Sequence, residues 1–396
     1  MDDSIFVNRP IGLYIHVPFC TTLCSYCDFY RTASESGVPE GFEMLLAREA
    51  DRYREDPPIE LDSIYLGGGT PSLLEEDSLE RLFEALREIF HWNAGVEVTL
   101  EANPETLSPE RVRRWRRAGV TRLSIGVQSL NDAELAALGR RATAGQAEAA
   151  VFCAAAEGYE RLSADLMLGI PGQTLQSFRG SLQRILSWPL DHLSAYMLDL
   201  HRGTALYQAV LRGEAELPGE DATSDMYEFM CGAAETHGFE QYEVSNFARP
   251  GGRSRHNLRY WRREDCIGIG PSAHGQLRGL RTENPRSTRE WSEKLSKGLA
   301  PHERTIRVSD RERLENRLIF GIRLSDGVEW GLVETLAGRE GRDAERLVAP
   351  LLENGYALLE EGRLRLTSRG FLLSNEILTY LLPAAGLSPG TETSTT

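Results

Sequence analysis

The segment Cys20-Thr-Thr-Leu-Cys24-Ser-Tyr-Cys27-Asp-Phe29 places three thiols within eight residues, in the spacing Cys-x3-Cys-x2-Cys. It comes shortly after the apolar run Ile11–Val17, which has the composition of a short buried strand. A loop of this length can turn all three sulfurs toward one centre. The segment therefore predicts a metal-binding loop at the end of the first strand.

The number of thiols distinguishes two kinds of metal site. A cubane iron-sulfur cluster has four iron corners, so three thiolates leave one iron open to an outside ligand. Structural zinc usually takes four ligands from two Cys-x2-4-Cys pairs, and the sequence contains no second pair of this kind. Buried free cysteines are common singly, but three at this spacing are not. We favour a cluster, with structural zinc and three unrelated cysteines as the alternatives.

Short β-rich runs alternate with helical stretches from residue 11 to about residue 200, which is the pattern of an α/β protein with a parallel sheet covered by helices. The predicted strands are 13–17, 63–66, 96–101, 122–127, 162–168 and 193–198. The predicted helices are 39–54, 72–89, 109–118, 132–157 and 175–188. Six β/α units fit a partial (β/α)6 barrel that is open on one side.

Polar or glycine residues follow most of these strands at the point where each strand ends. Ligands of parallel α/β sheets bind at the carboxyl ends of the strands. The run Gly67-Gly68-Gly69-Thr70 lacks the Cβ atoms that would keep a ligand from the main chain. Glu101, Gln128 and Asp165 can accept hydrogen bonds from ribose hydroxyls, an amine or an adenine edge. Each residue alone fits a tight turn, a helix cap or a satisfied core group equally well, but their shared position favours a ligand.

The cysteine spacing, with Tyr26 before the third cysteine, resembles the signature of the radical S-adenosylmethionine (SAM) superfamily. This resemblance implies a [4Fe-4S] cluster on Cys20, Cys24 and Cys27, with SAM bound to the open iron through its amino and carboxylate groups. The later motifs are similar to those of the oxygen-independent coproporphyrinogen III oxidase family and its haem-chaperone branch. By this resemblance the SAM contacts are Tyr14, Gly68, Gly69, Thr70, Glu101, Gln128, Arg140 and Asp165, and Tyr26 packs beside SAM. Arg140 suits the SAM carboxylate, because guanidinium binds carboxylate with two parallel hydrogen bonds.

A second motif, His256-Asn257-x-x-Tyr260-Trp261, joins an imidazole, an amide, a phenol and an indole within six residues. Neutral imidazole is a common axial ligand of haem iron, and aromatic faces can pack on a flat macrocycle. Nearby arginines can meet the propionates: Arg253, Arg255, Arg259, Arg262 and Arg263. Taken alone, the motif fits a structural histidine and core aromatics better. Together with the following Gly-x-Gly-x-x-Ala turn it resembles the haem-chaperone branch, where the motif is associated with haem binding.

Phe29 separates the two branches of the family, because the oxidase motif carries a fourth cysteine at this position. The resemblance therefore implies a haem chaperone that passes haem to an acceptor protein, for which a respiratory-chain component is a candidate. The alternative is an oxygen-independent coproporphyrinogen III oxidase or another radical SAM enzyme that acts on a tetrapyrrole. Two positions depart from the chaperone pattern: Ala142 replaces the usual histidine, and Cys266 replaces a commoner aromatic residue.

Four segments are expected along the chain. Residues 1–205 would form the barrel, 206–305 an extension with the haem motif, and 306–382 a winged-helix-like domain, because helical patterns there precede a small hairpin. The tail 383–396, rich in Pro, Gly, Ser and Thr, is expected to be disordered.

Composition limits the partners and the compartment. A net charge of -15 and the acidic pair Glu360 and Glu361 beside the expected hairpin argue against nucleic acid as a partner. No apolar run reaches the length of a membrane span, and bunched cysteines suit a reducing compartment. The sequence predicts a cytoplasmic protein with at most peripheral membrane contact.

Overall fold

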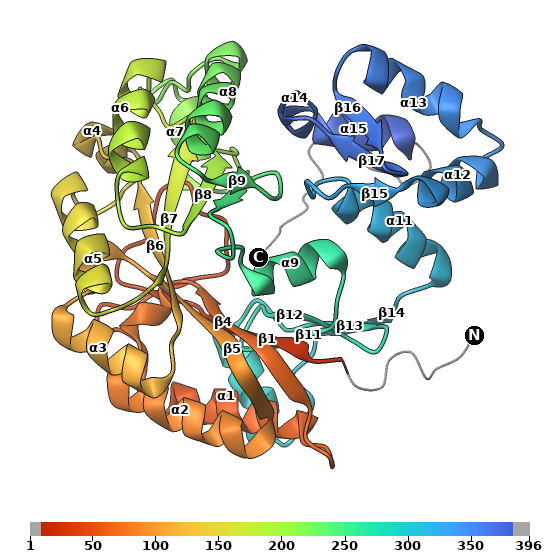
Figure 1. The fold of residues 1–396 in the computed structure, drawn as a ribbon. Coiled ribbons are helices and arrows are strands. Elements are labelled where there is room, and N and C mark those ends of the chain that lie inside the picture. The colour runs from red at the N-terminus through yellow and green to blue at the C-terminus, as the bar shows by residue number, and fades with distance from the viewer. Residues whose placement is uncertain (1–8, 383–396) are drawn as a thin grey trace. The chain divides into compact units, whose positions relative to one another are not determined.

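The computed structural model describes residues 9–382, which divide into two compact units (Figure 1). Within these residues, unit 1 comprises the chain up to Met226 together with Asp265–Arg307. Unit 2 comprises Tyr227–Glu264 and the chain from Val308 onward. Each unit is therefore built from two separate segments of sequence.

Unit 1 is organised around six parallel strands, each paired with the next in chain order. They are β1 (Ile11–Val17), β4 (Glu60–Gly68), β5 (His91–Ala102), β6 (Arg122–Gln128), β7 (Arg161–Leu168) and β8 (His192–Met197). All six strands predicted from the sequence are confirmed, and β4 and β5 extend further toward the amino terminus than expected. Every residue of β1 is buried, which explains its continuous apolar composition.

The other edge of β1 pairs in parallel with a strand from the second segment of unit 1. This strand, β11 (Cys266–Ile269), begins an antiparallel run that continues through β12 (His274–Leu277), β13 (Leu280–Glu283) and β14 (Arg304–Arg307). The sheet is therefore mixed, with β1 in its interior.

Helices connect the parallel strands of unit 1. They are α1 (Phe42–Ala50), α2 (Glu76–Ile89), α3 (Pro109–Ala118), α4 (Asp132–Ala137), α5 (Ala144–Ala156) and α6 (Leu175–Leu186). Two further helices are α7 (Ala205–Leu211), which follows β8, and α10 (Thr288–Ser296), which lies between β13 and β14. Short 3-10 turns are η2 (Asp51–Tyr53), η3 (Pro71–Leu73) and η4 (Pro104–Thr106). Burial of apolar side chains stabilises these helices, as α2 illustrates. Four of its apolar residues recur at helical spacing and are all buried: Leu79, Leu82, Phe83 and Leu86. Burial of each such side chain is worth roughly 1.5–3 kcal/mol.

One helix prediction is wrong, because the expected single helix 132–157 is two helices, α4 and α5. Gly139 adopts a left-handed φ of 72°, which ends α4. Thr143 then starts α5 with a capping box, in which its side chain and that of Gln146 satisfy each other's backbone N–H groups. Arg140 lies in the break between the two helices.

Unit 2 is mostly helical, with two short antiparallel ladders. Its helices are α9 (Arg255–Arg262), α11 (Asp310–Gly321), α12 (Trp330–Arg339), α13 (Ala344–Glu353), α14 (Ser368–Leu372) and α15 (Ser374–Leu381), and α8 (Glu220–Thr236) contains a boundary between the units. The ladders are β9 (Glu240–Gln241) with β10 (Asn246–Ala248), and the order β15 (Val328–Glu329), β17 (Arg363–Leu366), β16 (Ala357–Glu360).

The hairpin predicted near the end of the chain is confirmed as β16 and β17. Its two-residue loop, Glu361-Gly362, has positive φ at both positions, which matches the twist of paired strands. The disordered tail expected at 383–396 lies outside the described residues. Within residues 9–382 no helix has both the length and the apolar character that membrane crossing requires.

Candidate functional site

The cysteine loop leaves and returns at the carboxyl end of β1. Its first strand, β2 (Phe19–Cys20), pairs in parallel with β3 (Thr32–Ala33), and the Thr32 N–H donates to the Pro18 carbonyl at 2.6 Å. Cys20 is buried, whereas Cys24 and Cys27 are half-buried. The three thiols therefore lie on one closed loop, directly after the strand that the sequence predicted to carry it.

Two distant parts of unit 1 hold this loop. The Ser25 N–H donates to the Leu138 carbonyl at 3.0 Å, and its hydroxyl donates to Ala137 O at 3.1 Å, at the end of α4. On the other side, the Tyr30 hydroxyl accepts from the Thr288 N–H at 2.7 Å, at the start of α10. The positions of the thiols are thus set by long-range contacts as well as by their spacing in sequence.

Burial favours the protonated thiol at Cys20 and Cys27 when no metal is bound. Burial raises the pKa of Cys20, and it raises the pKa of Cys27 to about 11, while the nearby guanidinium of Arg31 acts in the opposite direction. A bound metal displaces such protons, because the ligand form is the thiolate. Among residues 9–382, no three His, Cys, Asp or Glu side chains are grouped to hold a single metal ion. A cubane does not need such a group, because each thiolate binds a different iron.

Three polar side chains connect Cys20 to Cys24. The Thr70 hydroxyl donates to Cys20 Sγ at 3.5 Å, and the Asn103 amide donates to Thr70 Oγ1 at 3.2 Å. Arg140 donates to Asn103 Oδ1 at 3.0 Å and lies 3.8 Å from Cys24 Sγ. The sequence singled out Thr70 and Arg140, but it did not identify Asn103 as a site residue. Its position two residues after Glu101, where β5 ends, was the available signal.

The glycine run after β4 is packed against the protein itself. A Cβ on Gly68, which has a φ of 105°, would lie 2.4 Å from Cε1 of His16, and a Cβ on Gly69 would lie 2.7 Å from the carbonyl carbon of Pro18. These distances are shorter than any real Cβ contact. Close packing of the ends of β4 and β1 therefore requires glycine at both positions, in addition to any approach by a ligand.

Two carboxyl groups lie on β5 and β7, the strands that flank β6 in the sheet. Glu101 accepts from the Tyr65 hydroxyl at 2.8 Å and from the Gly68 N–H at 3.3 Å, and Asp165 accepts from the Ser124 hydroxyl at 3.0 Å. Desolvation raises the pKa of Glu101 to about 7 and that of Asp165 to about 6, although both side chains keep some exposed surface. Carboxylate oxygens at these positions can accept hydrogen bonds from ribose hydroxyls or an amine.

The remaining SAM candidates have different surroundings. Tyr14 is buried and donates to Nδ1 of His16 at 2.9 Å, because the other ring nitrogen of His16 donates to the Tyr30 carbonyl. Gln128 ends β6 with a φ of 65°, a left-handed conformation that costs about 1–3 kcal/mol in a non-glycine residue. Tyr26 packs against the buried cluster Leu138, Met167 and Ile170. Backbone strain at the end of a strand marks Gln128 for functional testing.

The second motif forms helix α9 in unit 2. Ser254 caps this helix by accepting from the Asn257 N–H at 3.3 Å. His256 is completely buried and hydrogen-bonded through Nε2 to the Tyr260 hydroxyl at 3.0 Å, one turn later. Burial lowers the pKa of His256 to about 3, so its imidazole is neutral at physiological pH. Asn257, Tyr260 and Trp261 keep part of their surface exposed.

Arginines around α9 have acidic or aromatic neighbours in unit 2. Arg253 and Arg262 lie 3.8 and 3.7 Å from the Asp326 carboxylate, and Arg259 lies 3.3 Å from Glu264. Arg263 lies over the ring of Phe320, with 4.8 Å between the guanidinium carbon and the ring centroid. Any propionate bound here would therefore compete with existing partners.

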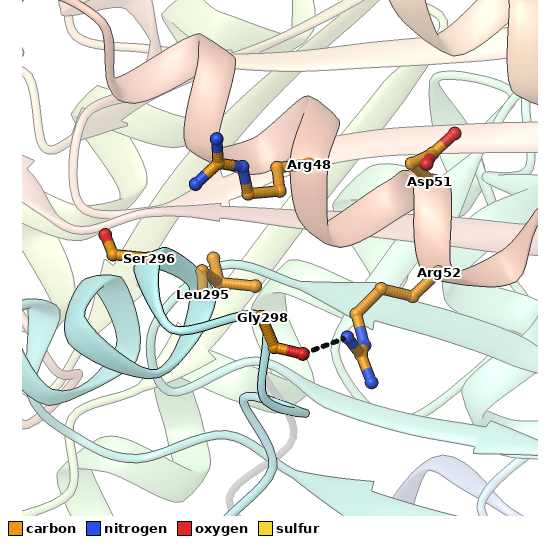
Figure 2. A pocket seen from close by; sticks show the side chains of 6 residues that line it. All are labelled: Arg48, Asp51, Arg52, Leu295, Ser296 and Gly298. Atoms are coloured by element: carbon orange, nitrogen blue, oxygen red, sulfur yellow. Dashed lines mark hydrogen bonds between the residues drawn. The ribbon is translucent and has the colours of Figure 1, made fainter.

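A pocket with a volume of about 390 Å3 lies between the end of α1 and the end of α10. Figure 2 shows the side chains that line it. Its lining residues are Arg48, Asp51, Arg52, Leu295, Ser296 and Gly298, and Arg52 donates to the Gly298 carbonyl at 3.3 Å. Because α1 leads the chain back to the amino end of β4, this pocket lies away from the carboxyl ends of the strands. None of the predicted site residues lines it.

Comparisons with known proteins agree with this geometry. Residues 14–185 match the radical SAM superfamily, and residues 308–373 match the HemN C-terminal domain. The structure is similar to that of coproporphyrinogen III oxidase (HemN) from Escherichia coli, with a TM-score of 0.80 and 22% identity, over 96% of this chain and 91% of that one. This likeness concerns the fold. The chain is a radical SAM protein with an α/β fold and a large mixed sheet.

Full-length relatives narrow the class. The chain is 34% identical to heme chaperone HemW of Bacillus subtilis over 370 residues, which are 92% of this chain and 97% of that protein. It is 37% identical over 386 residues to the mouse protein "Radical S-adenosyl methionine domain-containing protein 1, mitochondrial", covering 94% of this chain and 87% of the relative. The chain belongs to the HemW haem-chaperone family. Membership in the radical SAM superfamily implies a [4Fe-4S] cluster and SAM as cofactors.

Proposed function

We propose that this chain binds a [4Fe-4S] cluster through Cys20, Cys24 and Cys27, binds haem, and transfers the haem to an acceptor protein. The observation that carries the cluster assignment is the closed loop after β1, on which Thr70, from the end of β4, and Arg140, from the break between α4 and α5, donate to two of the thiols. Three thiolates on a cluster with four irons leave one iron corner for SAM. Phe29, at the position of a fourth cysteine in the oxidase, favours the chaperone.

The SAM site would lie over the carboxyl ends of β1 and β4 to β7. Glu101 and Asp165 would hold hydroxyl or amine groups, and Arg140 would bind the carboxylate. The other contacts proposed are Tyr14, Tyr26, Gly68, Gly69, Thr70 and Gln128. Support comes from the partial exposure and raised pKa of these two carboxyls, which lie on either side of β6 in the sheet.

Haem would bind at α9. Asn257, Tyr260 and Trp261 keep exposed surface there and can pack on the macrocycle. His256 is neutral, as an iron ligand must be, but it is buried and engaged by Tyr260. Coordination by His256 would therefore require α9 to rearrange or the Tyr260 hydroxyl to give way.

Several finer assignments accompany this function. The six parallel strands would curve into a partial (β/α)6 barrel, and the residues from 306 to 382 would form a winged-helix-like domain that packs or covers rather than binds nucleic acid. We assign the protein to the cytoplasm, with peripheral membrane contact at most. A respiratory-chain component is the proposed acceptor.

The test uses anaerobically reconstituted protein in two parallel assays. Haem titration is followed by the Soret band, and products are analysed after incubation with SAM, a reductant and coproporphyrinogen III. We expect saturable haem binding at one site and no decarboxylated product. Stoichiometric protoporphyrinogen with 5'-deoxyadenosine, and weak haem binding, would instead support the oxidase.

A further inference from the structure

Hydrogen bonds link Cys20 to Cys24 through the side chains of Thr70, Asn103 and Arg140. In each of these hydrogen bonds it is fixed which group donates and which accepts. Arg140 comes from the break between α4 and α5, and its terminal nitrogen also donates to the Gly126 carbonyl at 2.8 Å. A guanidinium group can only donate. The Asn103 side chain must therefore present its oxygen to Arg140, which leaves its nitrogen facing Thr70.

The direction is passed on to the next group. The amide nitrogen of Asn103 also can only donate, so the Thr70 oxygen is the acceptor in their 3.2 Å hydrogen bond. A hydroxyl has one proton, and that of Thr70 is left to point at Cys20 Sγ, 3.5 Å away. Thr70 is itself buried, so water does not offer it an open alternative.

We infer that Asn103 is a positioning residue that holds the Thr70 hydroxyl as a hydrogen-bond donor to the Cys20 thiolate and thereby raises the reduction potential of the cluster. The inference rests on the proposed ligation of the cluster by Cys20. Hydrogen bonds to ligand sulfurs help to set the potentials of iron-sulfur clusters, because they stabilise the more negative, reduced state.

The size of the effect follows from one hydrogen bond. If the hydrogen bond from Thr70 stabilises the reduced cluster by a net free energy of about 1 kcal/mol, the equilibrium between reduced and oxidised cluster changes about fivefold. At 59 mV per tenfold change for a one-electron couple, this is about 40 mV. A shift of this size is resolved by a redox titration monitored by electron paramagnetic resonance, in the absence of SAM.

A matched pair of variants tests the hydrogen bond to sulfur. Thr70→Val keeps the shape of the side chain without the hydroxyl, whereas Thr70→Ser keeps the hydroxyl. We expect the midpoint potential to fall by about 40 mV in Thr70→Val and to stay near the wild-type value in Thr70→Ser. Equal potentials in the two variants would overturn the inference.

The role of Asn103 is tested by reversing its direction. In Asn103→Asp both side-chain oxygens accept, so the Thr70 hydroxyl turns toward the carboxylate and away from Cys20. The new charge also lowers the potential, but it does so equally in a Thr70→Val background. We expect Asn103→Asp to lower the midpoint potential by about 40 mV more when residue 70 is threonine than when it is valine. If the effects of the two substitutions are additive, the positioning role is refuted.

Two controls separate the possible failures. Iron and sulfide analysis of the wild type and of Cys20→Ala tests the ligation first, and a cluster that does not depend on Cys20 would overturn the proposed function itself. If Asn103→Asp does not retain a cluster, the neutral Asn103→Leu replaces it. Its potential is expected to fall between those of Thr70→Ser and Thr70→Val, and a wild-type value would refute the inference.

Discussion

Replacing Gly68 by alanine is expected to destabilise unit 1 through a clash with His16. The new Cβ would lie 2.4 Å from Cε1 and 2.5 Å from Nδ1 of the imidazole ring. The ring cannot move aside without losing its hydrogen bonds to the Tyr14 hydroxyl, at 2.9 Å, and the Tyr30 carbonyl, at 3.0 Å. Overpacking costs about 1–3 kcal/mol, and a left-handed alanine adds about 1–3 kcal/mol. The sum, about 2–6 kcal/mol, is a large part of a typical free energy of unfolding of 5–15 kcal/mol.

Gly41 offers a matched control. Its φ is 80°, but a Cβ there would have no other atom within 4 Å. Gly41→Ala should therefore cost only the backbone strain, about 1–3 kcal/mol. Urea unfolding of both variants, followed by circular dichroism, measures the difference. If Gly68→Ala loses no more stability than Gly41→Ala, contact with His16 is not the reason for glycine at the end of β4.

Three further predictions concern the cluster, the haem and the pH dependence of stability. Cys24→Ala should abolish the intact cubane, because no spare thiol can replace the ligand; an iron and sulfide content equal to wild type would contradict this. His256→Ala should weaken haem retention in a Soret titration while the cluster stays intact, and an equal haem affinity would remove His256 from the haem site. Glu49 is buried, accepts from the Gly270 N–H and the Trp291 indole at 2.7 Å each, and has its pKa raised by burial from 4.5 to about 7. Because the folded-state pKa is above the unfolded value, protonation of Glu49 stabilises the fold at low pH, and this contribution, about 3 kcal/mol, is lost as the pH rises from 4.5 through 7. The melting temperature of the wild type should thus fall more between pH 5 and pH 8 than that of Glu49→Gln, and parallel pH profiles would disprove the assignment.

The order of strands in unit 1 was predictable because it depends on local patterns. β1 and β6 to β8 are apolar runs bounded by polar or turn residues, and each was found within a few residues of its expected position. The break between α4 and α5 was missed, since the alanine-rich pattern continues across it. Gly139 and Thr143 gave the signal, but either residue also occurs inside a continuous helix.

The candidate site was predictable only in part. Cysteine spacing is a local property, so the loop after β1 could be recognised directly. Asn103 was not identified, because its partners Thr70 and Arg140 are 33 and 37 residues away and its amide has a direction only in their presence. The burial of His256 was equally inaccessible, since the motif does not show which face of α9 turns inward.

The placement of β1 between β4 and β11 affects how the protein is made. Its partner β4 follows soon after it, but β11 starts at Cys266, about 250 residues after β1 ends. At synthesis rates of roughly 5–20 residues per second, one edge of β1 stays open for about 12–50 s. The Thr288 contact that holds Tyr30 emerges from the ribosome later still. If the cluster is inserted during translation, the sheet is still incomplete and has an unpaired edge, which is prone to aggregate. If the cluster is inserted after release of the chain, both edges of β1 are already paired.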